Sequence, residues 1–166
     1  MDRNIAVAMA NLSTGIYVLT VDDGAHRHGM SSSWVVQVSG TPPLFMAAVD
    51  NNHFSRAMLA KVGAFGFNIV GRRGKELEDY FYSARSRRPD NLDGLAYELS
   101  PKLKVPWLDR AMISIEARVV DSHVAGDHTI FIAEMTDVRI RDKDEPLTSL
   151  DLEYVYIGGK EVVKRE

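Results

Sequence analysis

Polar and apolar residues alternate through the stretch from Gly29 to Leu44, which contains a double proline near its end. Successive side chains of a strand point to opposite faces of its sheet. One face then carries Ser31, Ser33, Val35, Gln37 and Ser39, and the other carries Met30, Ser32, Trp34, Val36 and Val38. We expect the second face to join a hydrophobic core and the first to offer hydroxyl and amide groups. The pattern alone also fits a strand with one solvated face, so it leaves a ligand open.

Hydrophobic patterning predicts most of the remaining elements. Apolar runs indicate strands over 16–21, 44–49, 65–69, 112–121, 129–141 and 153–157. A helical pattern of Phe54, Met58, Leu59 and Val62 ends at Gly63, and residues 74–82 indicate a second helix. Residues 83–111 fit a surface excursion with short strands. Because hairpins outnumber helices, we expect a mainly β (α+β) fold, built as a closed or nearly closed antiparallel barrel.

Composition narrows the classes of function. The chain has 166 residues, a net charge of −3 and no cysteine. Its length suits a single domain, and its charge gives no reason to expect binding to nucleic acid or to a membrane. The lack of cysteine excludes disulfides, iron–sulfur clusters and thiol catalysis. Because no apolar run is long enough to span a bilayer and the first residues lack a leader pattern, we expect a cytoplasmic protein.

Four segments, taken in their order and spacing, resemble the flavin reductase-like family, whose fold is the FMN-binding split β-barrel. Residues 12–20 are similar to its opening strand, with Ser13 where the family often has proline. Gly29-Met-Ser-Ser-Ser-Trp34 with Pro42-Pro43 matches its flavin-binding strand, Phe65-Gly-Phe-Asn-Ile69 resembles the strand after the first helix, and Gly126-Asp-His128 matches a hairpin. The resemblance covers residues 12–159, and it implies one split-barrel domain with two or so short helices.

The same resemblance implies a non-covalently bound FMN, or in some members FAD, near a homodimer interface, with NADH or NADPH as electron donor. It places contacts to the flavin ring along Met30, Ser31, Ser32, Ser33, Trp34 and Val35. Backbone groups can serve there alongside the hydroxyls, and Trp34 can instead be a core residue. The flavin phosphate or ribityl chain is expected near a helix start, where free amides suit an anion. The candidates are Ser55 and Arg56, then Asn52 and His53, although Asn52 or Ser55 can instead cap the helix.

His128 is the candidate catalytic residue, because it follows Gly126 and Asp127 in the matching hairpin. Its imidazole titrates near neutral pH and can hydrogen-bond a nicotinamide amide or protonate reduced flavin. The alternative is an exposed histidine in a turn, and Asp127 either orients the ring or only shapes that turn. Asn68 resembles a family position near the flavin but can equally satisfy buried backbone groups. His26 and His28 have no obvious third ligand, so we expect no metal site.

We expect an NAD(P)H-dependent flavin reductase that binds FMN, transfers hydride from nicotinamide to flavin and supplies reduced flavin to a separate monooxygenase. The alternative is a flavoprotein that keeps its FMN and passes electrons to a protein partner. A pyridoxamine-phosphate-oxidase-like barrel with another ligand is a third candidate, and the Gly126-Asp-His128 hairpin counts against it. In both leading cases the cofactors carry the chemistry and the protein positions them.

Overall fold

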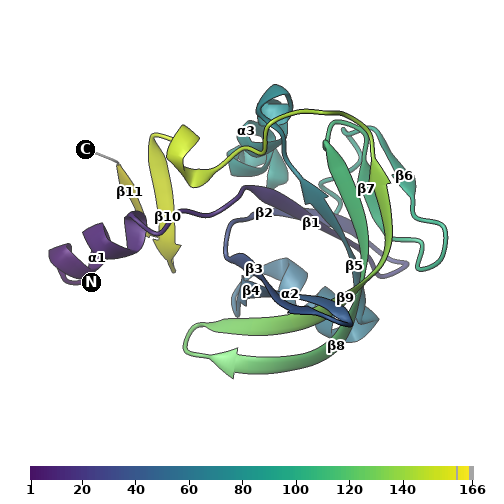
Figure 1. Ribbon diagram of the computed structural model, residues 1–166, viewed down its shortest axis with the longest axis horizontal. Helices are drawn as coiled ribbons and strands as arrows, with labels where there is room; N and C mark the ends of the chain where they lie inside the picture. The colour runs from purple at the N-terminus through teal and green to yellow at the C-terminus, as the bar shows by residue number, and fades with distance from the viewer. Residues whose placement is uncertain (160, 165–166) are drawn as a thin grey trace.

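The computed structural model describes residues 1–159 and 161–164, and seven antiparallel strands form one curved sheet in it (Figure 1). These strands are β1 (Tyr17–Asp22), β2 (Arg27–Ser32), β3 (Val35–Gly40), β4 (Pro43–Asp50), β5 (Ala64–Ile69), β8 (Ile113–Ala125) and β9 (His128–Ile140). Their order across the sheet is β2-β1-β5-β8-β9-β4-β3. The sheet rolls into a barrel whose edge strands β2 and β3, both fully described, are not paired with each other. The expected antiparallel split barrel is confirmed.

The expected single strand through residues 29–44 is wrong, because the chain turns at Ser33 and Trp34. β2 and β3 on either side of this turn lie at opposite edges of the sheet. The amide of Val35 donates to the carbonyl of Ser33, and the carbonyl of Trp34 accepts from the amide of Ala48 on β4. The first hydrogen bond closes the turn and the second holds it against β4, so the chain passes from one edge of the barrel to the other within two residues.

The inward faces of the strands fill the barrel with a core that includes Leu19, Phe45, Phe65, Phe67 and Phe131. Phe45 stacks on Phe67 with the ring centroids 4.7 Å apart. Met30 joins this core, whereas Val36 and Val38 are 45% and 48% exposed. The predicted apolar face therefore ends where the strand breaks.

Helix α2 (Phe54–Val62) packs against β1, β2, β4 and β5 and adds Met58 and Leu59 to the barrel core. Phe54, also expected on the inner face, is 43% exposed. Gly63 ends the helix as predicted, with a φ of 67°. A residue without a Cβ adopts that left-handed conformation at little steric cost.

Helix α3 (Lys75–Tyr82) and the short helices η1 (Arg72–Gly74) and η2 (Ala84–Ser86) lie outside the sheet, with α3 against β1 and β2. Leu77 and Phe81 of α3 belong to a second core with Leu92 and Leu108. The excursion over 83–111 contains the expected short strands, β6 (Tyr97–Leu99) and β7 (Pro106–Leu108), which pair with each other. This excursion is therefore a packed outer layer of the barrel.

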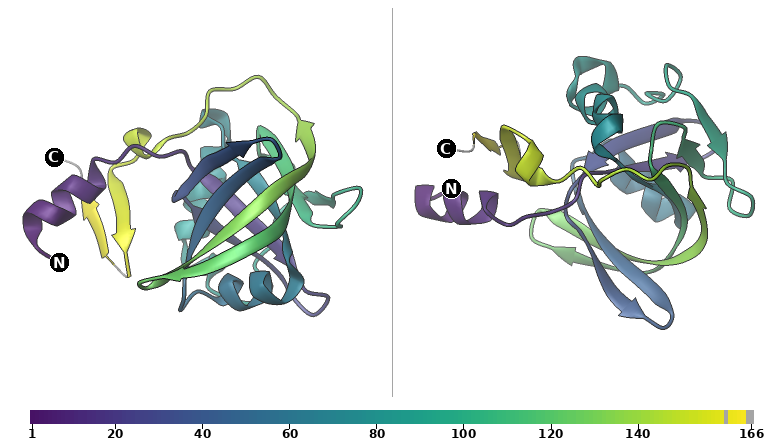
Figure 2. Two further views of the ribbon diagram at one scale, coloured as in Figure 1. Left: turned by 60° about the horizontal axis from the view of Figure 1, so that its bottom comes forward. Right: turned by 45° about the horizontal axis from the view of Figure 1, so that its top comes forward.

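A small group made of both ends of the chain lies beside the barrel (Figure 2). It consists of α1 (Arg3–Ala10), η3 (Ser149–Asp151), β10 (Tyr154–Gly158) and β11 (Glu161–Lys164). Ala10 of α1 packs on Val155 and Ile157 of β10. Only β10 was expected from the sequence. Among the described residues, no helix is long and apolar enough to cross a membrane.

Candidate functional site

A pocket of about 240 Å³ lies beside the turn at Ser33 and Trp34, where the chain changes edges. Its lining comes from distant parts of the chain: Met30 to Trp34 around the turn, Asp50 at the end of β4 and His53 after it, Phe81 and Tyr82 of α3, His128 of β9, and Tyr156 and Gly159 near the C-terminus. Because the barrel is split at this place, the two edges and α3 can enclose one cavity.

Most of the predicted contacts to the flavin ring line this pocket. Met30, Ser31, Ser32, Ser33 and Trp34 all do so. Val35 does not, because it already belongs to the β3–β4 ladder, where it pairs with Ala47. The pocket therefore uses the end of β2 and the turn, and excludes the strand that follows.

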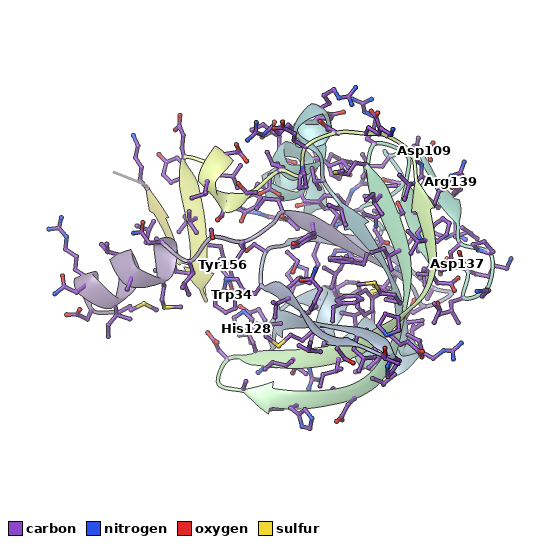
Figure 3. The ribbon with its side chains drawn as sticks, viewed as in Figure 1. Trp34, Asp109, His128, Asp137, Arg139 and Tyr156 are labelled. Atoms are coloured by element: carbon purple, nitrogen blue, oxygen red, sulfur yellow. The ribbon has the colours of Figure 1, made fainter. Side chains whose placement is uncertain are left out.

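One side of the pocket is formed by Trp34, His128 and Tyr156, which we call the aromatic wall (Figure 3). The rings of Trp34 and His128 are stacked, with centroids 4.6 Å apart and planes 29° apart. Tyr156 lies against Trp34 with ring centroids 5.5 Å apart. Since the three side chains come from the β2–β3 turn, β9 and β10, this wall exists only in the folded chain.

Both ring nitrogens of His128 have partners. Nδ1 lies 2.6 Å from Oδ1 of Asp127, and Nε2 lies 3.4 Å from the Tyr156 hydroxyl. Burial, together with the charges of Asp50 and Asp127, raises the pKa of Tyr156, so its hydroxyl keeps its proton and can donate. The hydrogen bond from His128 holds the pKa of Asp127 below its usual range. Because an ionised carboxylate only accepts hydrogen bonds, Nδ1 of His128 carries the hydrogen that points toward Asp127. The single O–H of Tyr156 is shared between His128 Nε2 and Asp50 Oδ2, each 3.4 Å away.

A second part of the lining is formed by Ser31, Ser32 and Ser33, with Glu78 of α3 behind Ser31, and we call these four residues the polar wall. The Ser31 hydroxyl donates to Oε2 of Glu78 at 2.6 Å. Ser32 and Glu78 are only 7% and 4% exposed. Burial raises the pKa of the Glu78 carboxyl to about 7, against the lowering effect of the Ser31 hydrogen bond and of Lys75.

The start of α2 borders the pocket through His53, which the sequence suggested only as a secondary candidate. His53 caps the helix, because its Nδ1 accepts from the amide of Ser55. The Ser55 hydroxyl is buried without a hydrogen-bond partner among the described residues. The Arg56 side chain donates to the Thr129 hydroxyl, and the backbone amide of Asn52 donates to the Asp50 carboxylate. Asn52, Ser55 and Arg56 thus lie at the turn beside the pocket but outside its lining.

Asn68, which the resemblance suggested near the flavin, does not line the pocket. Its side chain is fully buried and donates to the carbonyl of Val18 and the hydroxyl of Thr20. Its oxygen accepts from the amide of Leu108 and the hydroxyl of Ser114. The side-chain amide of Asn68 therefore links β1, β7 and β8. This matches the alternative expectation, that Asn68 satisfies buried polar groups.

Other polar clusters lie far from the pocket. Arg139 and Asp137 of β9 and Asp109 are on the opposite side of the barrel from the aromatic wall (Figure 3). There Arg139 pairs with Glu98, and Lys102 pairs with Asp137. These ion pairs tie the excursion over 83–111 to β9. Among the described residues, no group of three or more acidic, histidine or cysteine side chains could hold a metal ion.

Sequence reasoning did not single out Glu78, Asp50 or Tyr156. In the sequence Glu78 stands among charged neighbours on α3, and only its neighbours Leu77 and Phe81 show that this side of the helix is buried. Tyr156 occupies a β10 position next to buried Val155 and Ile157. Nothing local shows that Asp50 and Tyr156 line a pocket built by other elements, or that Glu78 bonds to Ser31 of its lining.

The two walls fit a flat heteroaromatic ring that has a polar edge. Hydroxyl groups on one wall can hydrogen-bond the edge of such a ring, and the aromatic wall offers flat apolar surface. Gly29 permits a close approach behind the polar wall, since a Cβ there would lie 2.7 Å from the Phe81 ring.

Comparison with known proteins agrees with this geometry. The model of the family described as "Flavin reductase like domain" matches residues 9–158. Among curated proteins, the FMN reductase (NADH) RutF of Agrobacterium fabrum is 24% identical over 89% of this chain and 83% of the relative.

One further curated protein and one solved structure also match the chain. The high molecular weight rubredoxin of Moorella thermoacetica is 26% identical over 85% of this chain, and the chain spans 62% of that relative's length. Among solved structures, the flavin reductase component of a bacterial two-component tryptophan halogenase has a TM-score of 0.79 at 23% identity, covering 89% of this chain and 92% of that one. The last match shows a shared fold.

Proposed function

The chain belongs to the flavin reductase-like family, and from that membership we propose that it is an NAD(P)H-dependent reductase of FMN that also accepts FAD. One observation carries the proposal: a polar wall and an aromatic wall face a single pocket at the split of the barrel. A flavin ring has matching surfaces, namely a polar pyrimidine edge and flat aromatic faces. The relative named as an FMN reductase (NADH) supports the same activity.

In this proposal the bound flavin supplies a hydride acceptor, and the protein binds and orients the two cofactors. Ser31, Ser32 and Ser33 bind the polar edge, and Trp34 packs beside the ring. His128 holds the nicotinamide at the aromatic wall, oriented by Asp127 at 2.6 Å.

The turn before α2 is the proposed phosphate site. The positive end of the helix dipole at a helix start attracts anions. The buried Ser55 hydroxyl has no partner among the described residues, and the positively charged Arg56 follows it. Asn52 lies in the same turn.

A spectrum of the purified protein, followed by titration with FMN and FAD, tests the binding step. We expect bound flavin or quenching of flavin fluorescence with micromolar or better affinity. Anaerobic addition of NADH, then NADPH, should bleach the flavin absorbance. Absence of quenching at high protein concentration would exclude the proposed function.

A flavoprotein electron carrier is the second candidate, because the matched high molecular weight rubredoxin is named as a redox protein of another kind. A reductase oxidises NAD(P)H in steady turnover when free flavin is added. A carrier retains one equivalent of flavin and shows no such turnover. The two measurements together separate the candidates.

Partners are proposed on the same basis. The solved reductase component of a two-component halogenase supports a separate flavin-dependent monooxygenase as the recipient of reduced flavin. A second copy of the chain is proposed to cover the group of α1 and β10, where Ile5, Leu12 and Tyr154 are at least half exposed. Light scattering should report a dimer. A reductase that draws on soluble NAD(P)H is expected in the cytoplasm, which cell fractionation tests.

A further inference from the structure

Glu78 is a buried carboxyl group directly behind the pocket. It lies on the face of α3 that packs against β2, next to the buried residue Leu77. Its side chain is 4% exposed. A buried carboxyl group normally pairs with a cation or keeps its proton, because desolvation disfavours the charged form.

The contacts of Glu78 give it no cation. Its hydrogen-bond partner is the Ser31 hydroxyl at 2.6 Å, and no ion pair joins it to any described residue. Lys75, one turn earlier on the helix, pairs instead with Asp79 at 2.6 Å. The pKa of about 7 follows from this burial, so both protonation states are populated near neutral pH.

The charged groups on the elements around Glu78 do not pair with its carboxyl group. On α3 itself the titratable groups near Glu78 are Lys75, Asp79 and Tyr82. On β2 the nearest polar group is Ser31, and the His28 imidazole is bonded to the carbonyls of residues 88 and 89. On β1, Tyr17 lies tilted against Phe67. On η1, Arg72 pairs with Glu145 and Arg73 pairs with Asp142, and on η2 Arg85 is exposed.

The protonation state of Glu78 decides how the Ser31 hydroxyl is oriented. An ionised carboxylate only accepts hydrogen bonds, so Ser31 must give it its single O–H and show only lone pairs to the pocket. A protonated carboxyl can donate to Ser31 instead. The Ser31 O–H is then free to donate into the pocket, which Ser31 lines.

We propose that Glu78 is a positioning residue that sets the direction of the Ser31 hydroxyl, so that the pocket binds flavin more tightly when Glu78 carries a proton. The inference rests on the proposed function for the location of the ring. The pyrimidine edge of a flavin has two carbonyl oxygens and one N–H, so a hydroxyl that donates finds more partners there than one that accepts. An ionised Glu78 would also repel those carbonyl oxygens.

Riboflavin binding measured by fluorescence quenching between pH 5.5 and 8.5 tests this directly. Riboflavin has no phosphate, so phosphate titration does not enter the result. For the unaltered protein we expect the dissociation constant to rise about tenfold across neutral pH, the equivalent of one hydrogen bond. In Glu78→Gln the neutral amide always can donate to Ser31, so the affinity should stay high and flat. Ser31→Ala should also be flat, with weaker binding at low pH.

Glu76→Gln is the matched control, because it makes the same substitution on the same helix at an exposed side chain that pairs with Arg110. It should keep the pH dependence of the unaltered protein. The pocket histidines His53 and His128 are present in all of these variants, so a slope that persists in Glu78→Gln would belong to them and would overturn the inference.

Carbon-13 NMR of the glutamate carboxyls in the flavin-free protein gives a readout independent of binding. One resonance should titrate near pH 7 and vanish in Glu78→Gln. If flavin does not bind at any pH, the proposed function fails whatever this resonance does. If flavin binds and no carboxyl titrates above pH 6, the proposed function stands and the role of Glu78 is refuted.

Discussion

The two walls of the pocket are built differently. The aromatic wall joins the β2–β3 turn, β9 and β10 by contacts between rings, with His128 stacked on Trp34 and Tyr156 tilted against it. The polar wall joins β2 to α3 through one short hydrogen bond to a buried acid, Glu78. Stacking changes little with pH, whereas a buried acid responds to it strongly. We therefore expect the aromatic wall to govern the rate of hydride transfer and the polar wall to govern pH dependence and stability.

The largest expected effect is on stability, from Glu78→Gln at alkaline pH. Glu78 has a raised pKa of about 7 in the folded chain against 4.5 unfolded. Between these values the folded state binds more protons than the unfolded state, so the free energy of unfolding falls as pH rises from about 4.5 and levels off above about 7. Glutamine carries no such penalty.

Denaturant unfolding at pH 5 and pH 8 measures this pH dependence of the free energy of unfolding. The stability of Glu78→Gln relative to the unaltered protein should increase by about 3 kcal/mol between the two pH values. Glu76→Gln, at an exposed position, should show no comparable gain. Equal pH profiles for the two variants would mean that Glu78 ionises normally in the folded protein.

A smaller change, a loss of folding stability, is expected from Gly29→Ala, which tests how closely α3 approaches the polar wall. A Cβ at Gly29 would lie 2.7 Å from the Phe81 ring and 3.0 Å from Leu92. Overpacking of this kind costs about 1–3 kcal/mol. Gly40→Ala, at the end of β3 with nothing within 4 Å of the added Cβ, is the matched control. Thermal unfolding should separate the two, and similar melting temperatures would show that α3 can move away freely.

At the aromatic wall, His128→Ala should slow NADH-dependent flavin reduction about tenfold while changing the affinity for FMN less, because the proposed role is to position the nicotinamide. Stopped-flow reduction and equilibrium titration measure the two quantities. Asp127→Asn keeps the ring and weakens its orientation, so it should have an intermediate rate. An unchanged rate in His128→Ala would remove this residue from the mechanism.

The sequence predicted the barrel well because its strands have strong local patterns. Leu44 to Val49 and the β8–β9 hairpin are apolar or alternating over their length, and the helix that ends at Gly63 carries its own stop signal. The break at Ser33 was missed because it is set by hydrogen bonds to β4, which no local pattern contains. Helix α1 was missed although Asp2 caps it, since its apolar side chains pack on β10 and β11, which lie at the other end of the chain.

The site was predicted only in part, because some of its residues stand in recognisable local segments and others are placed by tertiary packing. Residues Met30 to Trp34 and His128 stand in recognisable segments, and the structure brings them to one pocket. Tyr156 reaches that pocket only through the packing of β10, and Glu78 lies behind it, bonded to Ser31, only through the packing of α3. Asn68 stands in an equally recognisable segment, yet its four hydrogen bonds join strands elsewhere. Resemblance identified segments, and tertiary packing decided which side chains face the ligand.

The smallest expected effect comes from Tyr156→Phe, which separates stacking from hydrogen bonding in the aromatic wall. The Tyr156 hydroxyl lies 3.4 Å from both His128 Nε2 and Asp50 Oδ2, at the weak end of hydrogen-bond geometry. Its removal should change the rate of NADH-dependent reduction by about twofold at most. Tyr156→Ala, which also removes the ring packed on Trp34, should cost more. If Tyr156→Phe instead matches His128→Ala, the hydroxyl is delivering a proton through His128, and the aromatic wall would then do acid–base chemistry as well as stacking.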